Sequence, residues 1–481
     1  MHMANKLTYQ RLIYLILFFF LSNFGYSDPS GKTLIMGLRS NSTQLGEYIE
    51  KTEIREIPSE TVEFANGNTF VRVKGQLAGN VIYVLVPTEL TADDLMEALI
   101  KIRTAHSRGA KQVIVVTTED NFDRLHVLGK NKKVLNLDLK EMFSVAGADG
   151  VQDQNGIGAL NSVLPFKRHF SSQKSFVTSQ NHEDLGKDLA RILEVPYVEH
   201  PTDENIFKSN VFLISAQIEP VNDEFFKTLY QIREYKKKGA SVNFIAPYLP
   251  YARSDKSDQP GVSVTGRLIA DLIQHAGADS VTFMRAHAPQ SEGFFNIPTV
   301  HVNGRATITN FLKSQESPVI PEVVVAPDAG AQKDDTLYAD ELGLPIVVAN
   351  KQRDPLTAKT KFLGFSGGIT VRGRAVIIID DETASGSTLA QTAEHLKAEG
   401  ALTVVAVVTH LAGKAEKALE SPSIDYIVVT NTYPVTSKNP KLIVVSSANE
   451  IAEGLRPLIN HNFDLCAEIL SGVVTPERGL K

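Results

Sequence analysis

Cysteine is almost absent from this chain of 481 residues, and so is any excess of positive charge. The single cysteine, Cys466, can form neither a disulfide framework nor a cysteine-rich zinc site. With 49 basic and 55 acidic residues the formal charge is −6, so no general basic field attracts nucleic acid. A local phosphate pocket is still compatible with this balance.

Several common catalytic motifs are missing as well. The sequence has no Walker A loop, no HExxH, no GxSxG and no paired cysteines, which argues against the common NTPase, zincin and hydrolase classes. Apolar residues make up 43% and charged residues 22%, the mix of a globular protein with real cores rather than a disordered or fibrous chain. At roughly 150 residues per domain, the length suggests about three domains.

The N-terminus has the features of a secretory signal. Lys6 and Arg11 precede the apolar run Leu12–Leu21, and small residues near Ser27 offer a cleavage site. The run is shorter than the roughly 20 apolar residues of a membrane span. An uncleaved anchor and a wrongly assigned start are the alternatives, and in each case we exclude residues 1–30 from the fold. The protein is exported or periplasmic if the signal functions, and cytoplasmic otherwise.

Beyond residue 30, short apolar runs alternate with helical stretches. The runs are β-branched and apolar throughout, which is typical of strands buried on both faces of a parallel sheet. This rhythm predicts an α/β fold with mostly parallel sheets. The predicted strands are Val81–Val86, Gln112–Thr117, Val211–Ser215, Val242–Ala246, Val281–Met284, Val323–Ala326, Ile346–Ala349, Ala375–Ile379, Val404–Val408 and Tyr426–Thr430. The predicted helices include Asp93–Ser107, Asp223–Lys237, Val264–Gln274 and Leu389–Ala398.

The chain also resembles itself at a constant offset of 130 residues. Matching positions are Asn80 and Asn210, Asp93 and Asp223, Leu99 and Leu229, Arg103 and Arg233, and Ala146–Asp149 and Ala276–Asp279. A constant offset through helices and strands indicates a duplicated domain. Upstream the offset is 140, so the second copy has lost about ten residues before its Val211 strand. We therefore predict three modules, covering residues 31–165, 166–315 and 316–481.

The strongest candidate site follows the predicted strand Ala375–Ile379. Asp380 and Asp381 come at its carboxyl end, and the small-residue turn Ser385, Gly386, Ser387 and Thr388 leads into a helix. Backbone N–H groups and hydroxyls at a helix N-terminus bind phosphate. Acids at this edge of an α/β sheet are placed to hold ribose hydroxyls or a metal. The alternative is a capped helix with surface acids.

Weaker signals lie at other strand ends. Asp328 follows the strand Val323–Ala326, and Lys351 and Arg353 open a polar stretch that runs to Gly368. Two cations on a mobile loop could close over a polyphosphate, although such a loop is more often simply solvated. His287 follows a strand of the middle module, where a single histidine is usually structural.

Taken in order, these segments resemble the ribose-phosphate pyrophosphokinases, also called phosphoribosyl diphosphate synthetases. The similarity covers about residues 170–465, and more weakly 33–150. The segments that carry it are Pro220–Asp223, Pro247–Arg253, Gly293–Pro298, Pro327–Gly330, Lys351–Arg353, Asp380–Thr388 and Val429–Pro434. Each segment alone is weak evidence for the resemblance, but seven segments in the order in which the family has them are specific evidence.

The resemblance implies two phosphoribosyltransferase-like domains and transfer of the ATP pyrophosphoryl group to ribose 5-phosphate, giving phosphoribosyl diphosphate and AMP. It implies Mg²⁺ as cofactor, a homo-oligomer, and neither nucleic acid nor membrane as partner beyond the N-terminal segment. Module 166–315 would be the ATP side and module 316–481 the ribose 5-phosphate side. The implied roles are ATP binding for Arg253 and Asp258, metal binding for His287 and Asp328, and catalysis for Lys351 and Arg353. Asp380 and Asp381 would hold the ribose hydroxyls, and Ser385, Gly386, Ser387 and Thr388 the 5-phosphate.

Three positions depart from the family pattern. Ser254 stands where a glutamine is usual, and Ala384 replaces the acid of the phosphate turn. Arg285 replaces an acid two residues before His287, so it would bring a cation close to a Mg–ATP site. The loss of the acid at Ala384 argues mainly against a phosphoribosyltransferase, in which that acid can serve as a base.

The module 31–165 is a degenerate copy without the catalytic positions, since the offset places Ile157 against His287. It keeps a version of the family's adenine-contacting hairpin, Phe64–Asn68, with amides in place of acids. Two interpretations are open for this module. It either presents Phe64 and Asn66 to the site of the other modules as a tethered partner, or it only packs against them.

Three functions therefore compete. The first is an active synthetase, the second a weakened relative that binds ribose phosphates or nucleotides and regulates or scaffolds synthetases, and the third a phosphoribosyltransferase. The Lys351 and Arg353 pair favours the first, whereas Arg285, the amide-for-acid changes and the export signal favour the second.

Overall fold

The computed structural model describes residues 34–38, 55–64, 66–75, 77–87, 89–117, 126–128, 134–135, 138–153, 156–159, 174–257, 259–353 and 360–459. The predicted signal segment 1–30 and Asp258 lie outside these residues, so the predictions on them stay predictions. Within the described ranges, no helix is long and apolar enough to cross a bilayer.

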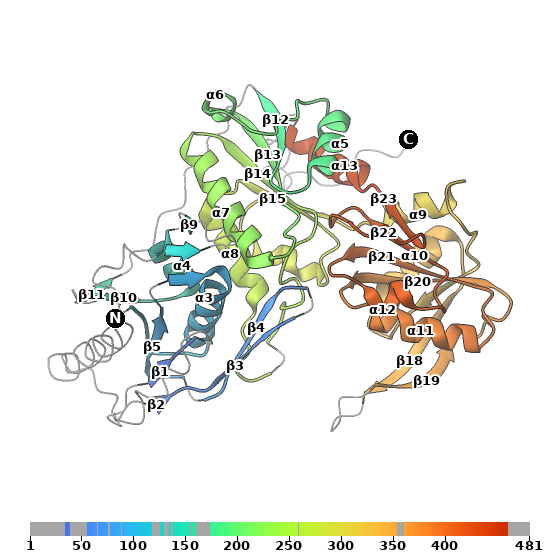
Figure 1. Ribbon diagram of the computed structural model, residues 1–481, viewed down its shortest axis with the longest axis horizontal. Helices are drawn as coiled ribbons and strands as arrows, with labels where there is room; N and C mark the ends of the chain where they lie inside the picture. Colours follow the sequence, from blue (N-terminus) through green and yellow to red (C-terminus); the bar gives the residue numbers. More distant parts are fainter. Residues whose placement is uncertain are drawn as a thin grey trace, which may run out of the picture.

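The N-terminal part is built on a six-stranded sheet in the order β11-β10-β7-β5-β1-β2 (Figure 1). All neighbours in this sheet are parallel except β10 and β11. The strands are β1 (Leu34–Met36), β2 (Arg55–Glu56), β5 (Val81–Val86), β7 (Gln112–Thr117), β10 (Gly150–Asp153) and β11 (Gly156–Ala159). The helices are α3 (Ala92–Ser107) and α4 (Leu139–Ala146). A separate hairpin pairs β3 (Ser59–Glu63) with β4 (Thr69–Val73), and a small sheet joins β6 (Glu89–Thr91), β8 (His126–Leu128) and β9 (Val134–Leu135).

The middle part has a five-stranded, fully parallel sheet in sequence order. Its strands are β12 (Ser175–Ser179), β13 (Asn210–Ile214), β14 (Ser241–Ala246), β15 (Ser280–Met284) and β16 (Thr299–Val302). Its helices are α5 (Glu183–Leu193), α6 (Asp203–Ile206), α7 (Val221–Lys237), α8 (Thr265–Ala276) and the 3-10 turn η3 (Pro289–Phe294).

The C-terminal part has a seven-stranded sheet in the order β19-β18-β17-β20-β21-β22-β23, parallel except for β18 and β19. The strands are β17 (Val323–Ala326), β18 (Ile346–Arg353), β19 (Thr360–Ser366), β20 (Ala375–Thr383), β21 (Thr403–Leu411), β22 (Tyr426–Thr430) and β23 (Leu442–Val445). The helices are α9 (Arg305–Lys313), α10 (Gln332–Leu342), α11 (Ser387–Ala398), α12 (Glu416–Glu420) and α13 (Ala448–Ile459).

The predicted α/β class with mostly parallel sheets is confirmed. Each of the ten predicted strands is present, and β14 and β17 are buried along their whole length, which explains their unbroken apolar character. The sequence prediction missed short edge strands such as β16 and β23, which are largely only half-buried and lack that pattern.

Two helices pack across the predicted module boundaries. The apolar side of α9 lies in the core of the C-terminal sheet, beside Val324 and Ile377. In return, α13 packs on the middle module, where Ile451 and Leu455 lie in one cluster with Leu189. The C-terminal and middle modules are therefore interlocked by an exchange of terminal helices, and the boundaries themselves remain predictions.

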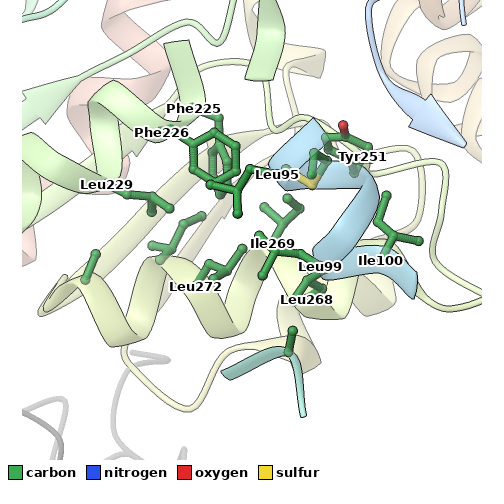
Figure 2. Packing of buried hydrophobic residues seen from close by; sticks show 14 of the residues in the cluster. Leu95, Leu99, Ile100, Phe225, Phe226, Leu229, Tyr251, Leu268, Ile269 and Leu272 are labelled. Atoms are coloured by element: carbon green, nitrogen blue, oxygen red, sulfur yellow. The ribbon is translucent and has the colours of Figure 1, made fainter. Parts of the chain in front are cut away.

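The first and middle modules share one apolar core. Leu95 and Leu99 of α3 lie in the same buried cluster as Phe225 of α7 and Leu272 of α8, and Figure 2 shows these side chains converging from the three helices. The helix α3 is well specified locally, because Thr91 and Asp94 form a capping box at its start. Because the two modules share this buried cluster, we expect them to unfold as one cooperative unit.

Replacing Leu99, which is fully buried, tests this cooperativity. Leu99→Ala is expected to lower the free energy of unfolding by about 2–5 kcal/mol, because it leaves a cavity in the shared core. Urea unfolding followed by circular dichroism measures the loss, and amide hydrogen exchange should accelerate in both β5 and β14. The matched control is Leu402→Ala, since Leu402 is 68% exposed and its loss should cost less than about 0.5 kcal/mol. Unchanged exchange in β14 would show that the modules unfold independently.

Candidate active site

The site is built on the carboxyl end of β20. Val376–Ile379 are fully buried and hold this strand in the sheet between β17 and β21. The strand continues four residues beyond its predicted end at Ile379, so Asp380 and Glu382 lie within the ladder, opposite Val408 and His410. The acids therefore have positions fixed by backbone pairing.

The phosphate turn follows directly. Gly386 has φ +75°, and a Cβ at this position would lie 2.5 Å from the Cβ of Ala418, so only glycine fits. The hydroxyl oxygens of Ser385 and Ser387 lie 2.9 Å apart at the start of α11, and no side chain caps this helix. Ser385 and Thr388 are exposed. The turn therefore offers hydroxyls and helix N-terminal amides together, as a phosphate site requires.

His287 reaches this edge from the middle module. Its Nδ1 lies 2.6 Å from Oδ2 of Asp381, although the two residues are 94 positions apart in sequence. The purely structural interpretation of a histidine after a strand does not hold here, because the imidazole meets a candidate site acid across a module boundary.

Arg253 reaches the same edge from the loop after β14. Its Nε lies 3.7 Å from Oε2 of Glu382, and its side chain is 49% exposed. Sequence reasoning assigned no role to Glu382, which is buried. The period-two alternation of a strand could have found it, since Asp380 and Glu382 must lie on one face of β20.

Asp328 lies at the end of β17, the neighbour of β20, and is exposed. Its Oδ1 accepts hydrogen bonds from the backbone of Gly330 and Ala331, at 2.8 and 3.0 Å. Among the residues that the structure describes, no three histidine, cysteine or acidic side chains are close enough to hold a metal ion by themselves. The exposed carboxylate of Asp328 and the acids of β20 fit Mg²⁺ held largely by phosphate oxygens and water, which is the usual mode for this ion.

Lys351 and Arg353 do not lie in a loop, so the predicted loop from Lys351 to Gly368 is wrong in part. Both belong to β18, which pairs with β19 as an antiparallel ribbon, Lys351 opposite Phe362 and Arg353 opposite Thr360. Figure 1 shows this ribbon extending beyond the body of the C-terminal sheet. The apolar half of β18, Ile346–Ala349, gave the strand signal that the sequence analysis used, whereas the half from Asn350 to Arg353 is polar in sequence and gave none.

Arg285 does not face the candidate site as a free cation. It is buried and donates to the hydroxyl of Tyr338 at 2.7 Å, to Oγ1 of Thr409 at 3.0 Å and to Oδ2 of Asp334 at 2.7 Å. Its guanidinium also lies 4.0 Å from the buried carboxylate of Asp335. This departure from the family pattern is therefore a charge bridge between the middle and C-terminal modules.

The surroundings of Asp380 and Asp381 shift the pKa values of these two neighbouring acids in opposite directions. Burial, and then the charge of Asp381, raises the pKa of Asp380 to about 8. Burial would also raise the pKa of Asp381, but the hydrogen bond and charge of His287 outweigh it, so that this pKa is lowered. The same hydrogen bond raises the pKa of His287. These opposite shifts favour a proton on Asp380 and a negative charge on Asp381, and an incoming cation would favour release of that proton.

The comparisons with known proteins agree with this geometry. Residues 33–136 and 197–277 match the family model for the N-terminal domain of ribose phosphate pyrophosphokinase, and residues 358–464 match that for the phosphoribosyl synthetase-associated domain. The ribose-phosphate pyrophosphokinase of Wolinella succinogenes is 32% identical over 300 residues, which span 59% of this chain and 95% of that protein. The chain belongs to the ribose-phosphate pyrophosphokinase family.

Further relatives agree with the family assignment. Ribose-phosphate pyrophosphokinase 2 of Schizosaccharomyces pombe is 30% identical, across 56% of this chain and 87% of that protein. The crystal structure of phosphoribosylpyrophosphate synthetase from Mycobacterium smegmatis is similar with a TM-score of 0.53 and 27% identity, covering 60% of this chain and 99% of that one. That structure thus corresponds to about three fifths of the chain.

The pairing of His287 with Asp381 predicts a titration. In the ligand-free protein, the imidazole should titrate above its ordinary value of 6.5, because its protonated form donates to the carboxylate. The stability that this raised pKa contributes is complete below about pH 6.5 and is lost as the pH rises through the higher folded-state pKa. NMR of the histidine ring protons measures the titration, and Asp381→Asn should return it toward 6.5 or below. A titration that Asp381→Asn leaves unchanged would contradict the pairing.

The Arg285 bridge makes a second prediction. Arg285→Ala leaves the buried Asp335 without its cation, and should cost about 3–5 kcal/mol of unfolding free energy. Burial raises the pKa of Asp335 to about 8, and the charge of Arg285 lowers it from a still higher value. Because the folded-state pKa of this carboxyl lies above its unfolded value, its cost grows as the pH rises, so the loss should be larger at pH 9 than at pH 5. Denaturant unfolding at the two values measures this.

The control for that experiment is Arg305→Ala. Arg305 forms a half-exposed ion pair with Glu341 and should cost less than about 1 kcal/mol at either pH. An equal loss for Arg285→Ala and Arg305→Ala would contradict the bridge.

Proposed function

We propose that the protein is a ribose-phosphate diphosphokinase, which transfers the pyrophosphoryl group of ATP to ribose 5-phosphate and releases AMP. The observation that carries the proposal is the meeting of His287 and Arg253 from one module with Asp381 and Glu382 from another, beside the small-residue turn that opens α11. Family membership supports the same reaction.

In the proposed reaction, the anomeric oxygen of ribose 5-phosphate bonds to the β-phosphorus of ATP. The bond from that phosphorus to the α,β-bridging oxygen breaks, AMP leaves, and the anomeric hydroxyl gives up its proton. Transfers of this kind need little covalent chemistry from the protein, so catalysis consists of positioning and charge neutralisation. The residues of the site offer both.

The parts of the site divide these tasks. Ser385, Gly386, Ser387 and Thr388 would bind the 5-phosphate, and Asp380 and Asp381 the ribose hydroxyls. Arg253 and Asp258 would contact ATP, while Lys351 and Arg353 would neutralise charge on the transferred group. Asp328 and His287 would hold Mg²⁺, which when bound offsets the charge of the phosphates.

The second candidate function is a weakened homologue that binds ribose phosphates or nucleotides and regulates other synthetases. Ser254 and Ala384 favour it, because both replace residues usual in the family. Arg285 no longer does, since its charge is matched by the carboxylates of Asp334 and Asp335. A homo-oligomer, as in the sequence prediction, is part of the first proposal.

The assay combines the purified full chain with Mg²⁺, ATP and ribose 5-phosphate, and measures AMP by chromatography. We expect AMP to form only when ribose 5-phosphate is present. Lys351→Ala should lower kcat by about 100-fold or more, the usual effect of removing one group that stabilises transition-state charge. The matched control is Lys438→Ala, which removes an exposed lysine and should leave turnover unchanged.

The same assay distinguishes the two functions. If no AMP forms while calorimetry detects ribose 5-phosphate binding, the synthetase proposal fails and the regulatory homologue replaces it. Turnover that survives Lys351→Ala would point to a contaminating enzyme.

A further inference from the structure

The first and middle modules pack through corresponding helices. α3 and α7 occupy equivalent positions in the two copies, as do α4 and α8, and α3 packs on α7 while α4 packs on α8. Arg103 of α3 pairs with Asp271 of α8 at 2.7 Å, and Arg233 of α7 pairs with Glu141 of α4. Arg233 lies 130 positions after Arg103, and Glu141 lies 130 positions before Asp271. In a two-fold symmetric dimer, residue i of one copy contacts residue j of the other, and residue i of the second copy contacts residue j of the first. The two ion pairs follow this rule.

The apolar part of this interface obeys the same relation. Leu95 corresponds to Phe225 and Leu99 to Leu229, and all four lie in one buried cluster (Figure 2). Two separate chains would form such an interface by dimerisation. Here a single chain covers this face of its middle module with its own first module.

The first module also extends a hairpin over the middle module. Backbone N–H of Val73 on β4 donates to the carbonyl of Gly261 at 2.8 Å, and a Cβ on Gly261 would lie 1.9 Å from the carbonyl oxygen of Val73. Nearer the tip, the backbone N–H of Thr69 donates to the hydroxyl of Tyr251 at 3.1 Å. Figure 1 shows β3 and β4 reaching from the first module toward the C-terminal sheet. The middle module has α6 rather than a hairpin in the described stretch between α5 and β13.

The tip of this hairpin enters the candidate site. The side-chain amide of Asn66, which is buried, donates to Oε1 of Glu382 at 3.1 Å and lies 3.4 Å from the hydroxyl oxygen of Tyr248. Glu382 in turn faces Arg253 with its other oxygen, at 3.7 Å. Gly67 beside it has φ +76°, and a Cβ there would lie 2.8 Å from Val221, so the tip is held closely against α7. Asn66, Glu382 and Arg253 thus form a chain of contacts through all three modules.

We propose that the first module is a built-in pairing partner, and that Asn66 is a positioning residue that fixes Glu382, and through it Arg253, within the same chain. The proposal rests on the proposed function for the role of Arg253 toward ATP. The cis contact itself does not depend on that role. An amide suits this position because it donates to Glu382 without adding charge, whereas an acid would repel a buried carboxylate.

The kinetic test uses Asn66→Asp in the full chain. This change keeps the shape of the side chain but replaces the donor with a negative charge beside Glu382. The KM for ATP should rise about tenfold or more, as expected for loss of a hydrogen bond to a charged group. The KM for ribose 5-phosphate should change less than about twofold, and a single cooperative thermal unfolding transition should show that the variant is folded. Val62→Ala, on the half-exposed side of the same hairpin, is the control and should leave both KM values unchanged.

A complementation test separates action within a chain from action between chains. Asn66→Asp is coexpressed with Asp381→Asn, which has an intact hairpin and a damaged site. If the hairpin serves its own chain, the mixture has only the summed activities of the two variants. Recovery of the normal KM for ATP would show that the hairpin serves another copy, and would overturn the proposal, as would a normal KM in Asn66→Asp alone.

A cross-linking test needs no activity, and so distinguishes failure of this proposal from failure of the proposed function. Asn66→Cys and Glu382→Cys are combined in a Cys466→Ser chain and treated with a short bifunctional maleimide. We expect a cross-link within the chain, which migrates as a monomer on a denaturing gel and joins the two expected peptides in mass spectrometry. Cross-linked dimers, or no cross-link between these positions, would overturn the proposal even if AMP is formed. A cross-linked monomer, together with no AMP formation by the unchanged full chain, would leave the cis contact established and reject only the synthetase.

Discussion

The structure depends on the meeting of charges at the carboxyl end of β20. Asp381 accepts from His287 of the middle module, and Glu382 accepts from Asn66 of the first module while facing Arg253. Several like charges this close to one another are unfavourable unless cations or donors surround them. The three modules supply those groups, so their convergence at the end of β20 offsets the repulsion between its acids.

Packing between the modules holds the groups at the end of β20 in fixed positions. The first and middle modules share one apolar core, α13 packs back on the middle module, and the buried Arg285 joins the middle module to α10. None of these contacts touches the proposed substrates. Their common effect is to hold loops from distant parts of the chain in a fixed relation, which is how a rigid scaffold positions a site.

Much of this arrangement could be predicted from sequence because it is encoded locally. The buried strand before Asp380 and the glycine of the phosphate turn each leave a pattern in neighbouring residues, and the 130-residue repeat is visible when the chain is compared with itself. The capping of α3 and the strands of the parallel sheets are specified in the same way.

The remainder depends on contacts between residues far apart in sequence. Arg285 looked out of place because its partners, Tyr338, Asp334 and Thr409, come from the next module. The contact of Asn66 with Glu382 spans 316 positions. The family resemblance offered presentation of Asn66 to the site as one of two interpretations, but no local pattern pairs it with Glu382. The extension of β18 through Lys351 and Arg353 was missed because these residues are polar, although backbone pairing with β19 makes them part of the strand.

The most direct measurement of the central claim is hydrogen–deuterium exchange of the full chain with Mg²⁺, ribose 5-phosphate and an ATP analogue that resists cleavage between the α- and β-phosphates. The account predicts simultaneous protection of the hairpin tip around Asn66, the loop that carries His287 and the turn from Ser385 to Thr388. Protection confined to one of these segments, with the other two exchanging as in the free protein, would contradict a single site shared by three modules.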